Sequence, residues 1–238
     1  MLPRVQWVDL QERFPAFLFL RVHQLDLQAH FRLFLLPRVQ RLDLQANGEG
    51  DNPIIVVSLR KIMFKVSEII TTPPAEFQSE LQRKVYETFA AKEIPFERVD
   101  TDPGITMEDC QHIDAKIGVR IVKTIFLCNR QQTEFYLYVT TDDKPFITRE
   151  FCGALGIPRV SFASAEKLWE LTGVLVGATT ILSAILPQAN DVHLVMDRNV
   201  AQSQWYACTD GTATCFVKIK TSDLLDKYLA GKQLSIID

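Results

Sequence analysis

A lysine inside an apolar run is the first residue whose position suggests chemistry. Lys123 lies within Arg120 to Leu127 (R-I-V-K-T-I-F-L), a run that is otherwise typical of a buried strand. A charged group there costs several kcal/mol if it is dry and unpaired. Either the ammonium projects into a polar pocket, where it holds an anion or a carbonyl group, or it lies on the solvent face of the strand. The local pattern leaves both interpretations open.

Two further segments combine flexible backbone with small polar side chains. Gly173 to Thr180 reads G-V-L-V-G-A-T-T, and glycines four residues apart let a backbone approach a ligand closely. Thr209 to Thr214 reads T-D-G-T-A-T, which is dense in hydroxyl groups around the turn-forming pair Asp210-Gly211. The structural alternatives are a helix-to-strand turn for the first segment and a hairpin turn for the second.

Standard catalytic and metal-binding motifs are absent from the sequence. It contains no G-x-S-x-G, no H-E-x-x-H and no Walker loop, and His112 and His193 each stand alone. The cysteines are odd in number and form no C-x-x-C pair, which predicts reduced thiols in a cytoplasmic protein and no metal site. These cysteines are Cys110, Cys128, Cys152, Cys208 and Cys215.

Composition limits the class of protein. Of 238 residues, 47% are hydrophobic and 23% charged, which is ordinary for a globular protein and excludes disorder over most of the chain. The net charge of -3 excludes a strongly basic surface overall, so any nucleic-acid contact needs a local patch. The apolar run Gly173 to Leu186 falls short of the roughly 20 residues that span a bilayer, so no membrane segment is expected.

The first sixty residues differ from the rest. Leu2 to Leu18, Phe19 to Leu35 and Leu36 to Asn52 are three copies of a 17-residue unit that shares the motif D-L-Q. Residues 1–59 contain six arginines and no lysine, whereas the remainder contains twelve lysines. The motif V-Q-x-L-D-L-Q alternates apolar and polar residues, so each copy can offer one short strand. We expect residues 1–60 to be a non-essential or poorly ordered extension, and residues 61–238 to be the functional domain.

Hydrophobic periodicity predicts an alternation of helices and strands from residue 61 onward. Because several of the strands lie in hairpins, we expect a mixed α/β (α+β) domain with a curved sheet flanked by helices. The expected helices are 76–92, 106–117, 148–155, 164–172 and 222–230, and the expected strands are 96–100, 119–129, 134–141, 159–162, 192–197 and 214–219.

The order of several short blocks resembles a known family. K-T-I-F-L-C-N-R is followed by F-Y-L-Y-V, R-V-S-F-A-S-A-E-K-L, G-V-L-V-G-A-T-T, V-H-L-V-M-D, T-D-G-T-A-T and S-D-L-L-D-K-Y-L. Over about residues 76–230, this order is similar to the YbaK/prolyl-tRNA synthetase-associated editing domain in its freestanding, ProX-like form. The resemblance implies a barrel-like mixed sheet. It also implies hydrolysis of the ester that joins a wrong amino acid, such as alanine or cysteine, to the tRNA for proline.

The resemblance assigns roles to particular residues. The strand lysine of the family matches Lys123, the glycine-rich substrate loop matches Gly173 to Thr180, and the aspartate that ends a strand matches Asp197. The ester is already activated, so positioning a water molecule and stabilising the oxyanion can suffice. Lys123 and the backbone N–H groups of Gly177 and Ala178 are therefore the expected catalytic groups. The expected substrate-binding residues are Gly173, Thr179, Thr180, Asp197, Thr209, Asp210, Thr212 and Thr214.

Two departures from the family pattern keep a second function open. The loop has Val176 where the family has a proline. The His-Pro pair of the family falls at Ala207-Cys208, and Gly211 stands in place of an asparagine. The alternative to a deacylase is a non-catalytic relative that binds an aminoacyl-tRNA end, an amino acid or a protein partner. The expected partner is a mischarged tRNA acceptor end, with prolyl-tRNA synthetase as a further candidate and with no DNA, membrane or cofactor.

Overall fold

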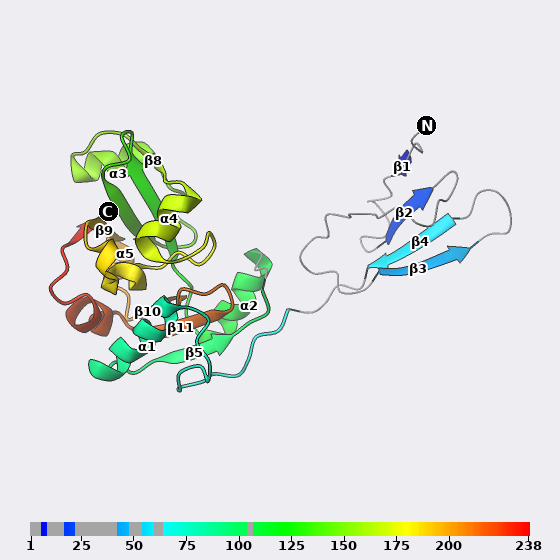
Figure 1. Ribbon diagram of the computed structural model, residues 1–238, viewed down its shortest axis with the longest axis horizontal. Helices are drawn as coiled ribbons and strands as arrows, with labels where there is room; N and C mark the ends of the chain where they lie inside the picture. Colours follow the sequence, from blue (N-terminus) through cyan, green and yellow to red (C-terminus); the bar gives the residue numbers. More distant parts are fainter. Residues whose placement is uncertain (1–5, 9–16, 22–41, 48–53, 60–63, 104–106) are drawn as a thin grey trace. The chain divides into compact units, whose positions relative to one another are not determined.

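The computed structural model describes residues 6–8, 17–21, 42–47, 54–59, 64–103 and 107–238. Contacts divide the chain into two units, Met1–Phe64 and Lys65–Asp238. The first unit holds an antiparallel sheet in the order β1-β2-β4-β3 (Figure 1). Its strands are β1 (Gln6–Val8), β2 (Phe17–Arg21), β3 (Leu42–Asn47) and β4 (Ile54–Leu59).

Two of these strands overlap the alternating motif of the repeat. β1 lies within the motif of the first copy and β3 overlaps that of the third copy. The corresponding motif of the second copy, residues 22–28, lies outside the described residues.

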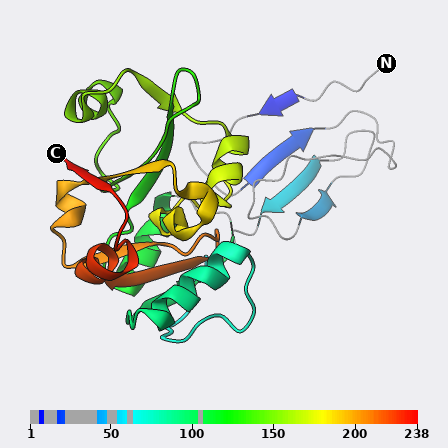
Figure 2. The same ribbon diagram turned by 60° about the vertical axis from the view of Figure 1, so that its left-hand side comes forward.

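The second unit contains two open sheets, visible from two sides in Figures 1 and 2. The larger sheet has the order β12-β9-β7-β6-β8, in which β9 pairs in parallel with both β7 and β12 while β6 pairs antiparallel with β7 and β8. Its strands are β6 (Lys123–Asn129), β7 (Phe135–Thr140), β8 (Val160–Phe162), β9 (Val192–Asp197) and β12 (Leu234–Ile237).

The smaller sheet has the antiparallel order β10-β11-β5. Its strands are β5 (Glu97–Asp100), β10 (Trp205–Thr209) and β11 (Cys215–Lys220). The mixed α/β fold is thus confirmed, but the two sheets do not close into a barrel. The short helix α5 (Arg198–Ala201) follows β9 directly and turns the chain away before β10 begins, so these consecutive strands belong to different sheets.

Local sequence signals set the ends of the helices. Helix α1 (Glu80–Ala91) starts after Ser79, whose hydroxyl accepts the N–H of Gln82 at 3.0 Å. The expected start at Glu76 was therefore too early.

Helices α3 (Thr148–Leu155) and α4 (Ala165–Thr172) end at glycines with positive φ. Helix α2 (Met107–Ile117) matches the prediction, except that Thr106 lies outside the described residues. The closing segment Asp223–Tyr228 is a π-helix.

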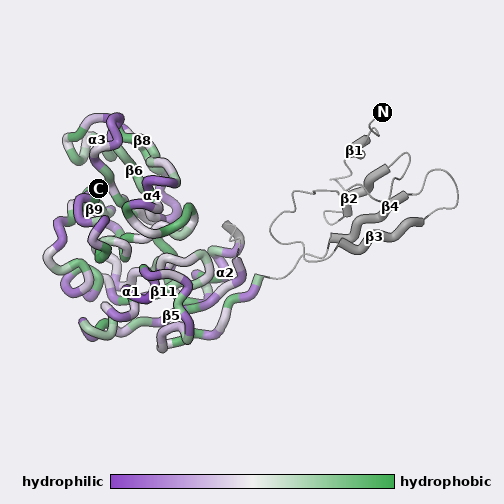
Figure 3. Tube along the Cα trace, viewed as in Figure 1, coloured by the Kyte–Doolittle hydropathy of each residue, from purple (hydrophilic) through white to green (hydrophobic). Residues whose placement is uncertain are grey.

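The core fills both sides of the larger sheet. One cluster joins the face that carries Phe126 and Met196 to the buried face of α1 and to the inner face of the smaller sheet, where Tyr206 lies. A second cluster packs Phe151 of α3 against Tyr136 and Tyr138 on the opposite face. In the second unit, apolar and polar stretches alternate along the coloured trace (Figure 3). Among the described residues no helix is long and apolar enough to cross a membrane.

Candidate functional site

Lys123 begins β6, and its ammonium group donates a hydrogen bond to the backbone carbonyl of Lys144 at 2.5 Å. The side chain is half-buried, so it belongs neither to the core nor to an open solvent face. Its cross-strand neighbour is Thr140 at the end of β7. Among the described residues, no carboxylate lies within ion-pair distance of Lys123. The positive charge is thus held in place by a neutral acceptor and remains uncompensated.

Asp197 ends β9 and is fully buried. Its carboxylate pairs with the ammonium of Lys144 at 2.5 Å and accepts the backbone N–H of Asn199 at 2.8 Å. The hydroxyl groups of Tyr138 and Thr140 lie at 3.4 Å. Burial opposes ionisation, but the hydrogen bonds from Lys144 and Asn199 outweigh it, so the pKa of Asp197 lies below its ordinary value.

Sequence reasoning missed Lys144. It lies in the polar segment 141–144 (T-D-D-K), directly after β7. The expected strand ended at Thr141, and no role was predicted for residues 142–144. Arg120 pairs with Asp142 and Asp143 at 2.9 and 3.0 Å, so these ion pairs hold the same loop from its other side. A run of three charges after a buried strand was the available signal.

The glycine-rich segment forms a tight turn after α4. Gly173 caps α4 with φ +66°, and the N–H of Ala178 donates to the carbonyl of Leu175 at 3.0 Å. Gly177 has φ +92° whereas Val176 is not among the described residues with positive φ, which is the pattern of a type II turn. The N–H of Ala178 is therefore engaged within the turn, and the geometry favours Gly177 as the donor available to a ligand. Val176 takes the position at which such turns accept proline.

The threonines after this turn face the protein interior to different degrees. Thr180 is fully buried, and its hydroxyl donates to the thiol of Cys208 at 3.5 Å and accepts the N–H of Leu182 at 3.3 Å. Thr179 is half-buried. These contacts attach the end of the glycine loop to the middle of β10.

The hydroxyl-rich segment 209–214 is a closed network around Asp210. The buried Asp210 carboxylate accepts from the side chains of Gln82 (2.8 Å), Tyr86 (3.1 Å) and Thr212 (2.8 Å), and from the Thr212 N–H (3.1 Å). Thr209 donates to the carbonyl of Thr212, and Thr214 exchanges a hydrogen bond with Gln78, which precedes α1. Burial among neutral partners raises the pKa of Asp210. This geometry gives the segment a structural role, while substrate binding by it stays a prediction.

Three of the predicted segments meet where the two sheets adjoin. The N–H of Val122, beside Lys123, donates to the carbonyl of Ala207 on β10 at 2.9 Å. The next residue, Cys208, contacts Thr180 of the glycine loop. The backbone beside Lys123 and the end of the glycine loop therefore both adjoin the position of the family's His-Pro pair on β10. The Lys123 ammonium itself contacts Lys144, whose side chain pairs with Asp197. The Asp210 network begins directly after the end of β10, two residues beyond Cys208, and lies against α1.

The thiol that replaces the family's proline is chemically quiet. Cys208 is buried, and burial raises the pKa of its thiol to about 12. Ala207 supplies no titratable side chain. All five cysteines are free, and no group of three or more His, Cys, Asp or Glu side chains suited to a metal occurs among the described residues.

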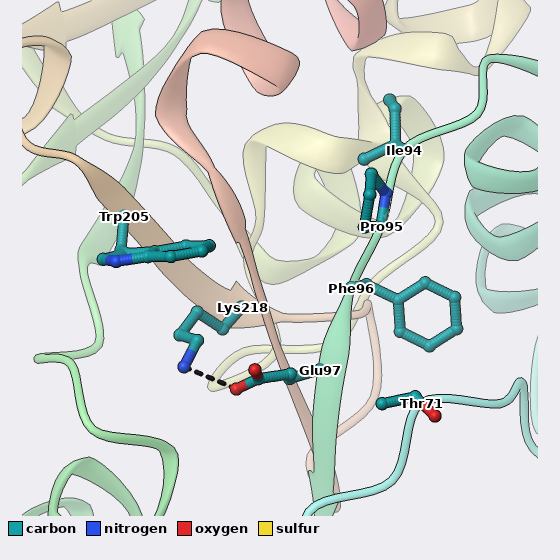
Figure 4. A pocket seen from close by; sticks show the side chains of 7 residues that line it. All are labelled: Thr71, Ile94, Pro95, Phe96, Glu97, Trp205 and Lys218. Atoms are coloured by element: carbon teal, nitrogen blue, oxygen red, sulfur yellow. Dashed lines mark ion pairs between the residues drawn. The ribbon is translucent and has the colours of Figure 1, made fainter.

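A separate pocket of about 440 Å³ lies on the smaller sheet (Figure 4). The Lys218 ammonium pairs there with Glu97 at 2.5 Å, donates to the carbonyl of Ile117 at 2.9 Å and lies over the ring of Trp205. These contacts already satisfy the charge of Lys218. None of the predicted site residues lines this pocket, whose other lining residues are Thr71, Ile94, Pro95 and Phe96.

Comparison with known proteins gives concordant results. The family model of the aminoacyl-tRNA editing domain matches residues 102–227. The prolyl-tRNA editing protein ProX of Acetoanaerobium sticklandii is 24% identical over 131 residues, which are 55% of this chain and 80% of that protein.

Solved structures support the fold. The crystal structure of a proposed trans-editing enzyme for prolyl-tRNA synthetase is 16% identical with a TM-score of 0.50, over 68% of this chain and 99% of that one. The structure of a hypothetical protein is 22% identical with a TM-score of 0.51, over 65% and 98% of the two chains. The resemblance drawn from the sequence is thus confirmed. Because the family model spans more than half of its residues, the chain belongs to the aminoacyl-tRNA editing domain family.

Proposed function

We propose that the chain is a freestanding aminoacyl-tRNA deacylase that hydrolyses the ester of a mischarged tRNA in trans. The observation that carries this proposal is the Lys123 ammonium, which is held by the backbone carbonyl of Lys144 and has no carboxylate within ion-pair distance among the described residues. It lies on a strand whose backbone adjoins β10. A fixed positive charge without a carboxylate partner suits an anionic or strongly polar ligand group. Membership of the editing family supports a tRNA substrate.

In the proposed reaction the protein supplies no covalent nucleophile. Water attacks the ester carbonyl, and the N–H of Gly177, an exposed residue of the glycine loop, stabilises the oxyanion. The carbon–oxygen bond to the ribose then breaks, and the ribose oxygen leaves with a proton as the amino acid is released. Lys123 holds a phosphate or ribose oxygen of the terminal nucleotide, which orients the ester.

The substrate that we propose is tRNA for proline carrying alanine or cysteine. A pocket of fixed size excludes a larger correct amino acid, although each methylene contributes only about 1–3 kcal/mol of discrimination. Delivery of the mischarged tRNA by prolyl-tRNA synthetase, and action in the cytoplasm, belong to the same proposal. The ProX relative, whose name gives prolyl-tRNA editing as its role, supports this choice.

A deacylation panel tests the function. The full chain is mixed with tRNA for proline charged with alanine, cysteine or proline, and with correctly charged alanyl-tRNA as the matched control. We expect hydrolysis of at least one of the two mischarged tRNAs above the spontaneous rate, and no hydrolysis of the two correct ones. Absence of hydrolysis across the panel would contradict the proposal.

One observation favours a non-catalytic alternative. The place of the family's histidine is taken by a buried alanine, Ala207, followed by a thiol that stays protonated at neutral pH. A chain that lacks that histidine can still bind an aminoacyl-tRNA end, an amino acid or a protein partner. Binding of charged tRNA without hydrolysis, together with loss of that binding in Lys123→Ala, would favour this alternative.

We further propose that residues 61–238 carry the function and that the repeat extension 1–60 is dispensable. Its internal copying and its lack of lysine support this view. A chain that starts at Met63 is expected to keep the activity of the full chain and its unfolding midpoint. A fall of more than about 10 °C, which is several kcal/mol for a domain of this size, would refute it.

A further inference from the structure

Lys144 makes two contacts that connect a buried acid to the proposed functional lysine. Its ammonium pairs with Asp197 at 2.5 Å, and its backbone carbonyl accepts the ammonium of Lys123 at 2.5 Å. The position of that carbonyl therefore depends on where the side chain of the same residue is anchored. A backbone hydrogen bond from its N–H to the carbonyl of Thr141, at 3.3 Å, closes the turn.

The anchor is rigid because Asp197 lies inside the larger sheet. Its residue is fully buried, and its strand β9 is paired on both sides, with β7 and with β12. Asn199 fixes the second carboxylate oxygen through its backbone N–H at 2.8 Å. Both carboxylate oxygens are thus held by contacts within the domain, and the Lys144 ammonium meets one of them.

The acceptor at Lys144 determines how the charge of Lys123 is presented. A carboxylate at this place would neutralise the ammonium, and open solvent would leave it mobile. A neutral carbonyl restrains one N–H of Lys123 and leaves the charge and the two remaining N–H donors for a ligand. The buried carboxylate of Asp197 needs only a cation beside it, which the Lys144 ammonium supplies. That need does not explain why the carbonyl of the same Lys144 also accepts from Lys123.

We propose that Lys144 is a positioning residue for Lys123: its ion pair with the buried Asp197 places the carbonyl that orients the substrate-holding ammonium. The catalytic part of this inference rests on the proposed deacylase function. The positional part concerns the free protein and stands independently of catalysis.

The central variant removes the ion pair without leaving a buried charge. Lys144→Met alone would strand the Asp197 carboxylate and destabilise the fold, which would confuse the result. The double variant K144M/D197N removes both charges together. Lys144→Arg keeps the pair as the conservative variant, and Lys167→Met on α4, whose ammonium pairs with exposed Glu170, is the matched control.

The first measurement needs no substrate. The proton–carbon NMR signal of the Lys123 Cε group is assigned by its loss in Lys123→Arg. We expect this signal to move in K144M/D197N, to stay close to its parent position in Lys144→Arg, and to stay unchanged in Lys167→Met. An unchanged Lys123 signal in a folded K144M/D197N variant would overturn the inference.

The second measurement is a kinetic cycle with Lys123→Ala. If Lys144 acts through Lys123, K144M/D197N lowers kcat/KM by about tenfold in the parent, but by less than about twofold when Lys123 is already alanine. We expect K144M/D197N to have a higher Tm than Lys144→Met but no higher activity. This result would show that the loss of activity does not come from a loss of folding. An equal loss in both backgrounds would show that Lys144 acts independently of Lys123, and would overturn the inference.

The two measurements keep the inference separate from the proposed function. If the parent protein hydrolyses no member of the tRNA panel, the deacylase proposal fails, and the NMR signal alone still decides whether Lys144 positions Lys123. If the panel is hydrolysed and the NMR signal does not move, the function stands and the positioning inference fails.

Discussion

Two fully buried aspartates at strand ends respond to their surroundings in opposite ways. Asp197 is paired with the ammonium of Lys144, and its pKa is lowered. Asp210 is surrounded by neutral donors from Gln82, Tyr86 and Thr212, and its pKa is raised by burial. Both satisfy the rule that buried polar groups have hydrogen-bond partners. The difference lies in what each aspartate joins. Asp197 holds the ammonium of Lys144, whose carbonyl accepts from Lys123, whereas Asp210 links the turn after β10 to α1.

The comparison separates residue type from residue role. We predicted substrate binding for Thr209 to Thr214 because the segment is rich in hydroxyl groups. Those of Thr209 and Thr214 bond to the backbone of the same turn and to Gln78, just before α1. We predicted no such role for the charged segment 141–144, yet it contacts both Lys123 and Asp197. The following predictions test this division, in order of decreasing effect.

The largest effect is expected from Asp210→Ala. The change leaves the side chains of Gln82 and Tyr86 and the Thr212 N–H buried without their acceptor. Because each such group costs about 1–3 kcal/mol, we expect the free energy of unfolding to fall by at least about 3 kcal/mol, measured by urea denaturation. Asp210→Asn, which keeps an acceptor oxygen, is the milder control. A loss below about 1 kcal/mol in Asp210→Ala would show that the network does not stabilise the packing of the turn against α1.

Gly211→Ala and Gly177→Ala compare the two turns directly. Both glycines have positive φ, at +97° and +92°, so a side chain strains the backbone at either position by about 1 kcal/mol. A Cβ at Gly211 would lie 2.6 Å from Cδ2 of Leu81, whereas nothing lies within 4 Å of one at Gly177. We expect Gly211→Ala to lower the free energy of unfolding by about 2–4 kcal/mol and Gly177→Ala by about 1 kcal/mol. Equal losses would contradict the difference in packing.

Lys123→Ala is expected to affect activity more than stability. Removal of the half-buried ammonium should lower deacylation at least about tenfold, on the order of 1.4 kcal/mol of transition-state stabilisation. The free energy of unfolding should change by less than about 1 kcal/mol, because no apolar cavity opens. Lys123→Arg should also lose activity, since a planar fork does not replace a compact ammonium. Unchanged turnover in Lys123→Ala would remove Lys123 from the proposed mechanism.

Val176→Pro should stabilise the glycine loop slightly. Val176 precedes Gly177 in a type II turn, and proline fits this position of such turns. We expect a gain of about 0.4–1 kcal/mol from the smaller entropy of the unfolded chain, read as a small rise in Tm. A fall in Tm would show that the backbone at Val176 does not suit proline.

The smallest effect is a difference in pH dependence between Asp197→Asn and Asp210→Asn. A lowered pKa means that Asp197 contributes stability above its ordinary value near 3.8, and that this contribution is lost only as pH falls below that value. A raised pKa means that Asp210 favours folding below its ordinary value and loses that contribution as pH rises above 3.8. Between pH 4.5 and 7, the stability of Asp210→Asn relative to the parent should therefore rise, and that of Asp197→Asn should stay constant.

Urea denaturation of the three proteins at pH 4.5 and 7 measures both trends. A pH-independent difference for Asp210→Asn would contradict the raised pKa. A change for Asp197→Asn over the same interval would contradict the lowered one.

The sequence predicted most elements of the fold because their periodicity is strong. β6, β7 and α4 were found with bounds within a few residues, since buried strands and a capped amphipathic helix leave clear local patterns. β10 was not among the expected strands, and it becomes a strand through pairing with β11. β12 was missed because four residues give too short a pattern, and β9 supplies its partner.

The candidate site was predictable only in part. Lys123 stands out because a charge interrupts an apolar run. Gly177 stands out because it lies four residues after Gly173 and small polar residues follow it. Lys144 contributes through its backbone carbonyl as well as its ammonium, and a residue type carries no information about which carbonyl faces a given side chain. The enclosure of Asp210 depends on Gln82 and Tyr86, more than a hundred residues earlier in the chain. Such contacts are set by the tertiary fold.

The pairing of β5 with β11 has a consequence for folding during synthesis. β5 ends at Asp100, and its partner Cys215 is separated from it by more than a hundred residues. The apolar side of α1, which packs with β10 and β11 in the core, is made equally early. As the chain grows on the ribosome, α1 and β5 are therefore synthesised long before β10 and β11. Until then Leu81 and Phe89 of α1 lack the strands that cover them. High contact order of this kind slows folding and lengthens exposure to aggregation, so this domain should depend on chaperones more than its modest size suggests.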